Sequence, residues 1–355
     1  MSTKLFAIGN EAIGYGAIQA GCKHFFGYPI TPQNEIPAFF AQELPKVGGI
    51  FTQTESEISS INMLYGAAAA GIRALTSTSS PGFSLMQEGI SAIATAEVPC
   101  VVVDVQRGGP GLGTTQTAQT DYLQATKSGA HGGCKNIVLA PASVQECHDF
   151  VQLAFYLADK YRMLSVVLSD GIIGQMREPL EVKKIEFGSL PEKTWAIKGT
   201  DEKGGTRNFI TSFIPWAYLD YLERARDKYA EIIQKEVRYE DKYLEDAKLV
   251  IVAYGSSARI AMEAIEQARS EGIKVGLIRP ITLWPFPEQI ISEKSKQVET
   301  FLVIEDSPGQ LIDDVKMSVE GRVETHLVSI FDRHERGSGG MIFPDKVYQE
   351  VKRLI

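Results

Sequence analysis

Short apolar runs alternate with longer segments of helical spacing along most of the chain. This alternation is typical of a layered α/β fold with a largely parallel sheet. The apolar runs predict strands at Phe25–Tyr28, Ile50–Thr52, Ala74–Thr78, Cys100–Val105, Asn136–Ala140 and Ser165–Ser169. The helical spacing predicts helices at Glu11–Ala20, Glu57–Ala70, Leu85–Ala96 and Val144–Tyr161, the last capped by Ser143.

The character of the sequence changes after residue 182 and again at Lys248. Residues 183–247 are charged and aromatic, which predicts an irregular crossover followed by a long surface helix. A second α/β unit then begins, with strands from Lys248, at Lys274–Ile278 and at Thr300–Glu305, and a helix at Ala258–Glu271. We therefore predict a doubly wound parallel-sheet domain at 1–182, a connecting segment at 183–247 and a smaller α/β domain at 248–355.

Composition narrows the function classes. The 355 residues carry a net charge of −8 with scattered basic residues, which argues against nucleic-acid binding. No apolar run approaches the roughly 20 residues of a membrane span, and the first residues lack a secretory-signal pattern. The four cysteines are far apart and form no C-x-x-C pair, so we expect reduced thiols in a cytoplasmic protein and no metal or cluster site in this chain.

The stretch "TESEISS" places two acids at the start of a predicted helix. Glu57 shares a helix face with Ile61, Leu64 and Ala68, so its carboxylate should be buried, whereas Glu55 precedes the helix and faces elsewhere. One interpretation is a capping box in which Glu57 reaches back to Thr54. The other is a desolvated carboxylate held for a ligand, because a buried acid is costly unless a donor meets it.

Three strand ends are followed by turns rich in glycine, proline and hydroxyl groups: "FGYPITP", "TSTSSPG" and "QRGGPGLG". Since ligands bind at the carboxyl ends of parallel strands, we expect these turns to line one crevice. Thr31 lies between two prolines that restrict its backbone. Arg107 precedes a glycine-rich run and could bind a carboxylate through its planar fork. The alternative for Arg107 is an ion pair with Asp104 or Asp121.

Other motifs are weaker. The small-residue run "GAAAAG" at 66–71 could admit a close partner backbone or a flat ligand. The turn "AYGSSA" could bind an anion at a helix start, although a plain strand-to-helix turn is favoured because the spacing and lysine of a phosphate loop are missing. His131, in a glycine-rich loop, has a surface role by default.

Four blocks of the sequence carry a combined pattern: "GYPITPQNE", "ESEISSINMLYGAAAAGIRALTSTSSPGFSLMQEG", "VQRGGPGLGTTQ" and "APASVQECHD". Together they resemble the α subunits of 2-oxoacid:ferredoxin oxidoreductases, which are thiamine-diphosphate enzymes. The resemblance covers residues 1 to about 182 densely. It implies a pyrimidine-type thiamine-diphosphate domain, and the segment 248–355 resembles the family's transketolase C-terminal-like domain.

The resemblance also implies roles for individual residues. Glu57 matches the acid that hydrogen-bonds N1′ of the cofactor's aminopyrimidine and thereby activates the cofactor. Thr31 and Arg107 match the residues that hold the substrate's oxo and carboxylate oxygens. Pro29, Ile30 and Ser79 are expected to contact the cofactor, whereas Glu55 has no such match.

A G-D-G signature for the diphosphate and Mg²⁺ is missing: Ser169-Asp170-Gly171 lacks the first glycine, and the only candidate asparagine is the distant Asn208. The resemblance therefore implies a cofactor shared with a β subunit that brings the diphosphate site, Mg²⁺ and [4Fe-4S] clusters. The small-residue helix would contact that β subunit. A γ subunit, often a ferredoxin-like δ subunit, CoA and ferredoxin are the further expected partners.

Details of the motifs look most like 2-oxoisovalerate-type subunits, with 2-oxoglutarate forms next. The resemblance implies CoA-dependent oxidative decarboxylation of a 2-oxoacid to acyl-CoA and CO₂. The alternatives are a non-oxidative decarboxylase or transketolase-like half-enzyme, and a non-catalytic α/β scaffold in which Glu57 only caps a helix.

Overall fold

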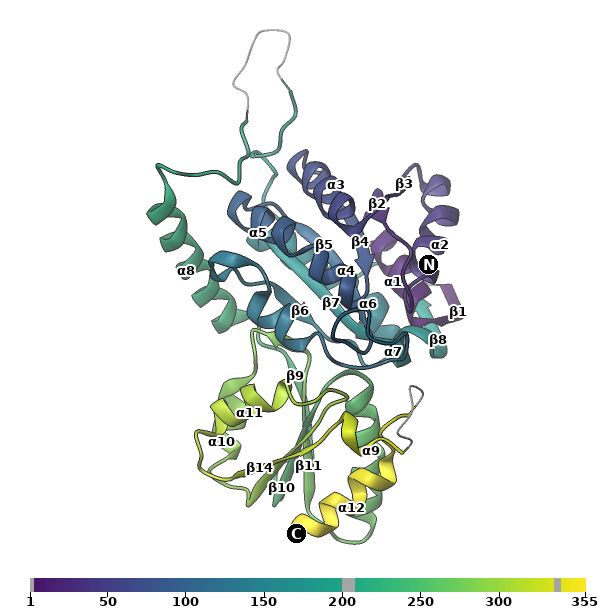
Figure 1. The fold of residues 1–355 in the computed structure, drawn as a ribbon, viewed down its shortest axis with the longest axis vertical. Coiled ribbons are helices and arrows are strands. Elements are labelled where there is room, and N and C mark those ends of the chain that lie inside the picture. Colours follow the sequence, from purple (N-terminus) through teal and green to yellow (C-terminus); the bar gives the residue numbers. More distant parts are fainter. Residues whose placement is uncertain (1–2, 200–207, 335–339) are drawn as a thin grey trace.

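The computed structural model describes residues 3–199, 208–334 and 340–355. It is a layered α/β fold with two main sheets, as predicted (Figure 1). The predicted segment "GTDEKGGTRN" lies almost entirely outside the described residues.

The larger sheet has seven strands in the order β12-β6-β7-β5-β4-β2-β3. All of its pairings are parallel except that of β12 with β6. Its strands are β2 (His24–Gly27), β3 (Ile50–Gln53), β4 (Ala74–Thr78), β5 (Cys100–Gln106), β6 (Ile137–Leu139), β7 (Leu164–Asp170) and β12 (Thr282–Trp284). Every residue of β4, β5 and β7 is buried, as expected for central strands of a parallel sheet that is covered on both faces.

Helices cover both faces of this sheet (Figure 1). One layer contains α1 (Gly9–Gln19), α2 (Glu35–Glu43) and α6 (Val144–Tyr161). The other contains α3 (Glu57–Ala69), α4 (Ser80–Leu85) and α5 (Gln87–Ala96). The bounds of α6 agree with the prediction, and the Ser143 side chain accepts a hydrogen bond from the Glu146 amide at 3.1 Å, which confirms the predicted cap. The predicted helix Leu85–Ala96 is confirmed as α5, which begins two residues later at Gln87, and the short α4 that precedes it was not predicted.

The smaller sheet has five strands in the order β14-β13-β10-β11-β9. They are β9 (Tyr239–Lys242), β10 (Leu249–Ala253), β11 (Val275–Pro280), β13 (Thr300–Ile304) and β14 (Glu324–Val328). Its helices are α9 (Gly255–Ser270), α10 (Glu288–Lys294), α11 (Leu311–Val319) and α12 (Pro344–Leu354). Two strands cross the division proposed from the sequence: β9 precedes residue 248 yet joins the smaller sheet, and β12 follows it yet joins the larger one.

The remaining elements lie at the edges. The sequence did not reveal β1 (Thr3–Ile8), which pairs antiparallel with β8 (Arg177–Val182). The predicted surface helix is α8 (Tyr218–Lys235), and the short α7 (Gly171–Gln175) follows β7. Within the described ranges, no helix is long and apolar enough to cross a bilayer.

The chain direction across the larger sheet reverses between β2 and β4. After β2 the chain moves outward to β3, and it then returns to the other side of β2 to form β4. Crevices in open parallel sheets form at such reversals, at the carboxyl ends of the strands. This reversal therefore marks the place to look for a site.

Candidate active site

The three predicted turns converge at the carboxyl ends of β2, β4 and β5. The Ser77 hydroxyl donates to Gln33 Oε1 at 2.6 Å, which joins the β4 end to the β2 turn. Arg107 Nη1 donates to the Thr31 carbonyl at 3.0 Å, which joins the β5 end to the β2 turn. The Arg107 amide donates to the Ser80 hydroxyl at 3.0 Å. These hydrogen bonds confirm that the three predicted turns lie together at one edge of the sheet.

Glu57 is the first residue of α3 and is only 4% exposed. The helix is capped by Ser56, whose side chain accepts a hydrogen bond from the Ser59 amide. Thr54 instead uses its hydroxyl on Ser60 at 2.6 Å and its amide on the Gly27 carbonyl at 3.0 Å. The capping-box interpretation of Thr54 and Glu57 is therefore wrong, because the Thr54 amide is already bonded elsewhere.

The Glu57 carboxylate has no hydrogen-bond or ion-pair partner among the described residues. A buried carboxylate without a donor carries a large desolvation cost, so a partner from outside the described structure would be strongly favoured. Glu55, in contrast, is exposed and accepts a hydrogen bond from the Ser59 hydroxyl, which lowers the pKa of its carboxyl. Of the two acids in "TESEISS", only Glu57 is therefore placed to meet a ligand.

Gly82 lies directly against the Glu57 carboxylate. A Cβ built on Gly82 of α4 would lie 2.3 Å from Glu57 Oε1 and 2.1 Å from Thr78 Oγ1, so both oxygens crowd the bare backbone at this point. The hydroxyls of Thr76, Thr78 and Ser79 are buried and have no hydrogen-bond partner. An unpartnered carboxylate and several unpartnered hydroxyls thus occur together at one strand end. Such orphaned polar groups in a native fold call for a ligand or water.

Arg107 is 6% exposed, and its guanidinium is held by backbone oxygens. Nη1 donates to Thr31 and Nη2 donates to the Leu112 carbonyl at 3.1 Å, while Nε is buried without a partner. The alternative of an ion pair with Asp104 or Asp121 is not found among the described ion pairs. The guanidinium therefore keeps its charge uncompensated by direct contact and retains free donors.

The remaining predicted residues lie at the rim. Pro29 is exposed, and Ile30 and Thr31 are half-buried. The Thr31 hydroxyl accepts only a long hydrogen bond from Asn34 at 3.5 Å. Residues 29–31 thus form an open edge, whereas Glu57, Ser79 and Arg107 lie inside.

Asp104, Asp121 and Ser80 form a cluster that sequence reasoning assigned no role of its own. Asp104 lies within the apolar strand β5, and Asp121 lies near the end of the loop that follows Arg107. Both are buried and both bond to Ser80 of α4. The sequence signal that could have revealed this cluster was Asp104, a charged residue within the mainly apolar strand β5.

The two motifs with possible phosphate chemistry have structural roles. Asp170 Oδ1 caps α7 by accepting from the Ile173 amide at 3.0 Å, and Oδ2 accepts from the Ser256 amide at 2.9 Å. This contact also occupies the start of α9, which confirms that "AYGSSA" is a strand-to-helix turn. Asn208 donates to carbonyls of Thr194 and Ala196, far along the chain from Asp170.

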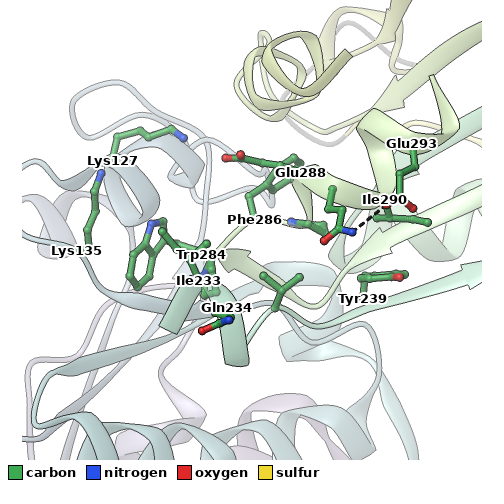
Figure 2. A pocket seen from close by; sticks show the side chains of 14 residues that line it. Lys127, Lys135, Ile233, Gln234, Tyr239, Trp284, Phe286, Glu288, Ile290 and Glu293 are labelled. Carbon is green, nitrogen blue, oxygen red and sulfur yellow. Dashed lines mark hydrogen bonds between the residues drawn. The ribbon is translucent and has the colours of Figure 1, made fainter. Parts of the chain in front are cut away.

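A cavity of about 630 Å³ lies elsewhere, between α8 and the connection from β12 to α10 (Figure 2). Figure 2 shows Lys127 and Lys135 at one end of it and Tyr239 and Glu293 at the other, with Trp284 and Phe286 between. None of its lining residues belongs to the three converging turns. Its lining contains both lysine ammonium and glutamate carboxylate groups, so the cavity indicates no preference for an anionic or a cationic ligand.

The chain is similar to known proteins along most of its length. Residues 15–215 match the family model described as pyruvate flavodoxin/ferredoxin oxidoreductase, thiamine diphosphate-binding. The chain belongs to this family. Residues 247–344 match the pyruvate:ferredoxin oxidoreductase core domain II. The resemblance to α subunits of 2-oxoacid:ferredoxin oxidoreductases is thereby confirmed.

Two relatives match along nearly their whole length. The chain is 49% identical over 352 residues to the ketoisovalerate oxidoreductase subunit VorB of Methanothermobacter marburgensis, covering 98% of this chain and 96% of the relative. It is 40% identical over 347 residues to the 2-oxoglutarate synthase subunit KorA of Methanocaldococcus jannaschii, covering 91% and 94%.

Two solved structures match the fold. The 2-oxoglutarate:ferredoxin oxidoreductase from Magnetococcus marinus matches with a TM-score of 0.86 and 28% identity. The match covers 99% of this chain but spans only 65% of that longer chain. A split-gene transketolase, an inactive β4 tetramer, matches with a TM-score of 0.61 and 15% identity over 98% of this chain and 97% of that chain, a likeness of fold alone.

The residues at the crevice fit the pyrimidine end of thiamine diphosphate. That end presents ring nitrogens and an amino group, which need an acid and hydroxyl partners. Glu57, Thr78 and Ser79 supply such groups, with none of them satisfied within the described chain. The described residues contain no cluster of three or more potential ligands for a metal ion.

Proposed function

We infer that the chain is the α subunit of a CoA-dependent 2-oxoacid:ferredoxin oxidoreductase, active together with a β subunit. The reaction converts a 2-oxoacid and CoA into an acyl-CoA and CO₂, and a pair of electrons passes to ferredoxin. The observation that carries this proposal is the buried, unpartnered Glu57 carboxylate beside unpartnered hydroxyls in a thiamine-diphosphate-binding fold.

Thiamine diphosphate, when bound, supplies the carbon nucleophile and the electron sink for decarboxylation. Glu57 holds the hydrogen bond at N1′ of the aminopyrimidine. Glu57 lies on the apolar face of α3, where the low local dielectric strengthens a single directed hydrogen bond. Gly82 leaves the space that this contact requires. Ser79, Pro29 and Ile30 line the cofactor.

Arg107 binds the substrate carboxylate through the donors that its backbone contacts leave free. Thr31, whose carbonyl orients the Arg107 guanidinium, presents its hydroxyl to the oxo or carboxylate oxygens. The two residues thus act as one unit, because movement of the Thr31 turn would move the guanidinium as well.

The preferred substrate is a 2-oxoisovalerate-type acid, with 2-oxoglutarate next. Arg107 is the one basic residue in residues 25–33, 76–82 and 106–121, which form the three turns. A second carboxylate, as in 2-oxoglutarate, would need another cation from outside these turns. The higher identity to a ketoisovalerate subunit than to 2-oxoglutarate subunits points the same way.

The other half of the site comes from partners. A β subunit supplies the diphosphate site, Mg²⁺ and [4Fe-4S] clusters, and γ and ferredoxin-like δ subunits complete a cytoplasmic complex. The exposed rim at Tyr28 and Pro29 and the exposed residues Gly66 and Ala70 of the small-residue run form the surface toward β.

Assay of the assembled complex with CoA, ferredoxin and a panel of 2-oxoacids tests the proposal. We expect ferredoxin reduction that requires both CoA and a 2-oxoacid, with 2-oxoisovalerate giving the highest kcat/KM. Decarboxylation without ferredoxin reduction would favour a non-oxidative enzyme instead. A higher kcat/KM for 2-oxoglutarate would overturn the substrate preference alone.

A further inference from the structure

Two buried carboxyl groups lie directly behind Arg107 and have no assigned role. Asp104 is fully buried and Asp121 is 5% exposed. Both bond to the same residue of α4: Asp104 Oδ1 accepts from the Ser80 amide at 3.1 Å, and Asp121 Oδ2 accepts from the Ser80 hydroxyl. Ser80 in turn accepts from the Arg107 amide, so one serine connects both acids to the arginine.

The bonding of these acids is asymmetric. Asp104 Oδ2 is buried without any donor, which would be costly for an ionised carboxylate. The Asp121 carboxylate is better stabilised, because the Ser80 hydroxyl donates to its Oδ2 and the Arg107 charge lies close by. If one of the two carries a proton, the geometry therefore assigns it to Asp104.

The electrostatics agree with this assignment. Burial raises the pKa of Asp104 well above its usual range, and the charge of Asp121 and a hydrogen bond between the two carboxyls raise it further. Burial also raises the pKa of Asp121, to about 6, while the Ser80 hydroxyl, Arg107 and Asp104 act in the opposite direction. Close carboxyls commonly share one proton in this way.

We propose that Asp104 is a neutral acid that donates its proton to Asp121, and that this acid pair positions Arg107 and balances its charge. The inference deepens the proposed function, because it rests on Arg107 as the carboxylate-binding residue. Above the titration of Asp121, its negative charge offsets the guanidinium. Below that titration the pair is neutral, and the substrate carboxylate meets the full charge of Arg107.

Other charged or titratable groups face the pair from the surrounding elements. Tyr254, at the start of α9, donates to Gln106 Oε1 at 3.4 Å, and burial keeps its pKa well above 10, so it stays neutral. Asp170 pairs in register with Gln106 on β7, and Glu57 lies across α4 beside Gly82. Neither of these carboxylates bonds to Ser80, whereas Asp121 does, and the Arg107 charge lowers the pKa of Asp121.

The first test is the pH dependence of the apparent KM for the 2-oxoacid in the assembled complex. We expect KM to rise about tenfold with pH around a midpoint near 6, the effect of one partly screened charge beside the guanidinium. Asp121→Asn should remove this transition. Asp104→Asn should keep the midpoint, because its amide can donate to Asp121 as the neutral acid does.

Asp104→Leu provides the contrast, since leucine can neither donate to Asp121 nor accept from Ser80. The midpoint should then move upward by about one pH unit, because Asp121 loses a stabilising donor. Asp159→Asn is a matched control: Asp159 is also buried, but it pairs with Arg73 and Lys193, and its pH profile should equal that of the wild type. A transition that survives in Asp121→Asn, or Asp104→Asn behaving like Asp104→Leu, would overturn the proposal.

Infrared difference spectra of the full chain give a readout that needs no activity. At neutral pH the wild type should show the carbonyl stretch of a buried protonated carboxyl, and Asp104→Asn should lack that band. A wild-type band that persists in Asp104→Asn, or no band at all, would contradict a neutral Asp104. If this band behaves as expected but the complex shows no 2-oxoacid-dependent turnover, the proposed function fails and the acid pair stands.

Discussion

At the scale of single residues, the unusual feature is a carboxylate that its own chain leaves unsatisfied. Glu57 is 4% exposed, Ser56 performs the capping that could have explained it, and no described group donates to it. Native folds rarely retain such a group without a use, because its desolvation is uncompensated. The unpartnered hydroxyls of Thr78 and Ser79 repeat the same pattern nearby.

Glu57→Gln in the assembled complex should lower kcat by at least about 100-fold, because an amide cannot exchange the proton that the acid controls at N1′. The isosteric change should leave the fold intact by circular dichroism. Glu55→Gln is the matched control, because Glu55 lies two residues before Glu57 and is exposed. Its kcat should stay within about twofold of the wild-type value. Wild-type turnover by Glu57→Gln would contradict the activation role.

Arg107→Ala should raise the apparent KM for the 2-oxoacid by roughly 10- to 100-fold, the range for losing hydrogen bonds to a charged group. The KM for CoA should change far less, because CoA does not share this carboxylate contact. Arg107→Lys should fall between, since it keeps the charge but loses the fork that reaches Thr31 and Leu112. Equal increases in both KM values would indicate a general loss of structure.

At the scale of elements, Glu57 depends on how closely α4 approaches α3. In Gly82→Ala the new methyl group would overlap Thr78 Oγ1 and Glu57 Oε1, so we expect a destabilisation of about 1–3 kcal/mol together with lower activity. Gly66→Ala is the control within α3, because its Cβ meets nothing within 4 Å. It should stabilise the chain by about 0.5–1 kcal/mol in denaturant unfolding. The two substitutions should therefore change the free energy of unfolding in opposite directions. Equal changes would contradict the close approach of Gly82 to Glu57 and Thr78.

Local signals were enough to predict the elements that carry their own patterns. The helix Val144–Tyr161 was recovered because Ser143 caps it, and β5 because it begins with the apolar run Cys100–Val103. The strand β1 was missed because its partner β8 lies at the other end of the domain in sequence. Likewise β12 joins the larger sheet only through tertiary packing. Pairings of this kind leave no local trace.

The residues of the site also fall into those that the sequence could predict and those that it could not. Thr31 and Arg107 could be placed in one crevice because each follows the carboxyl end of a strand of a parallel sheet. Glu57 could be singled out because it lies on the apolar face of its helix. The contact between Asp104 and Asp121 through Ser80 could not be foreseen, since it depends on where α4 begins. The sequence raised both acids as partners for Arg107, whereas the structure pairs them with one serine.

At the scale of the whole molecule, the loop that starts at Arg107 ends in the contact between the two sheets. Gln119 donates to the Tyr254 carbonyl at 3.0 Å and accepts from the Ser257 hydroxyl at 2.7 Å. Asp170 joins this contact by accepting from the Gln119 side chain at 3.1 Å. The smaller unit therefore stabilises the loop that carries the proposed substrate site.

The position of Asp170 in this contact also bears on how the cofactor is shared. Both of its oxygens accept hydrogen bonds within the chain, Oδ1 from the Ile173 amide and Oδ2 from the Ser256 amide and the Gln119 side chain, so the nearest match to a diphosphate signature has a structural role here. The isolated chain should consequently give no saturable heat with thiamine diphosphate and Mg²⁺ in calorimetry, under conditions in which the assembled complex titrates. The complex that carries Glu57→Gln is the control. It distinguishes binding of the diphosphate from activation at the aminopyrimidine, because it should still bind the cofactor while losing turnover. A single tight site on the isolated chain would show that this subunit holds the diphosphate by itself, and the shared site would then be wrong.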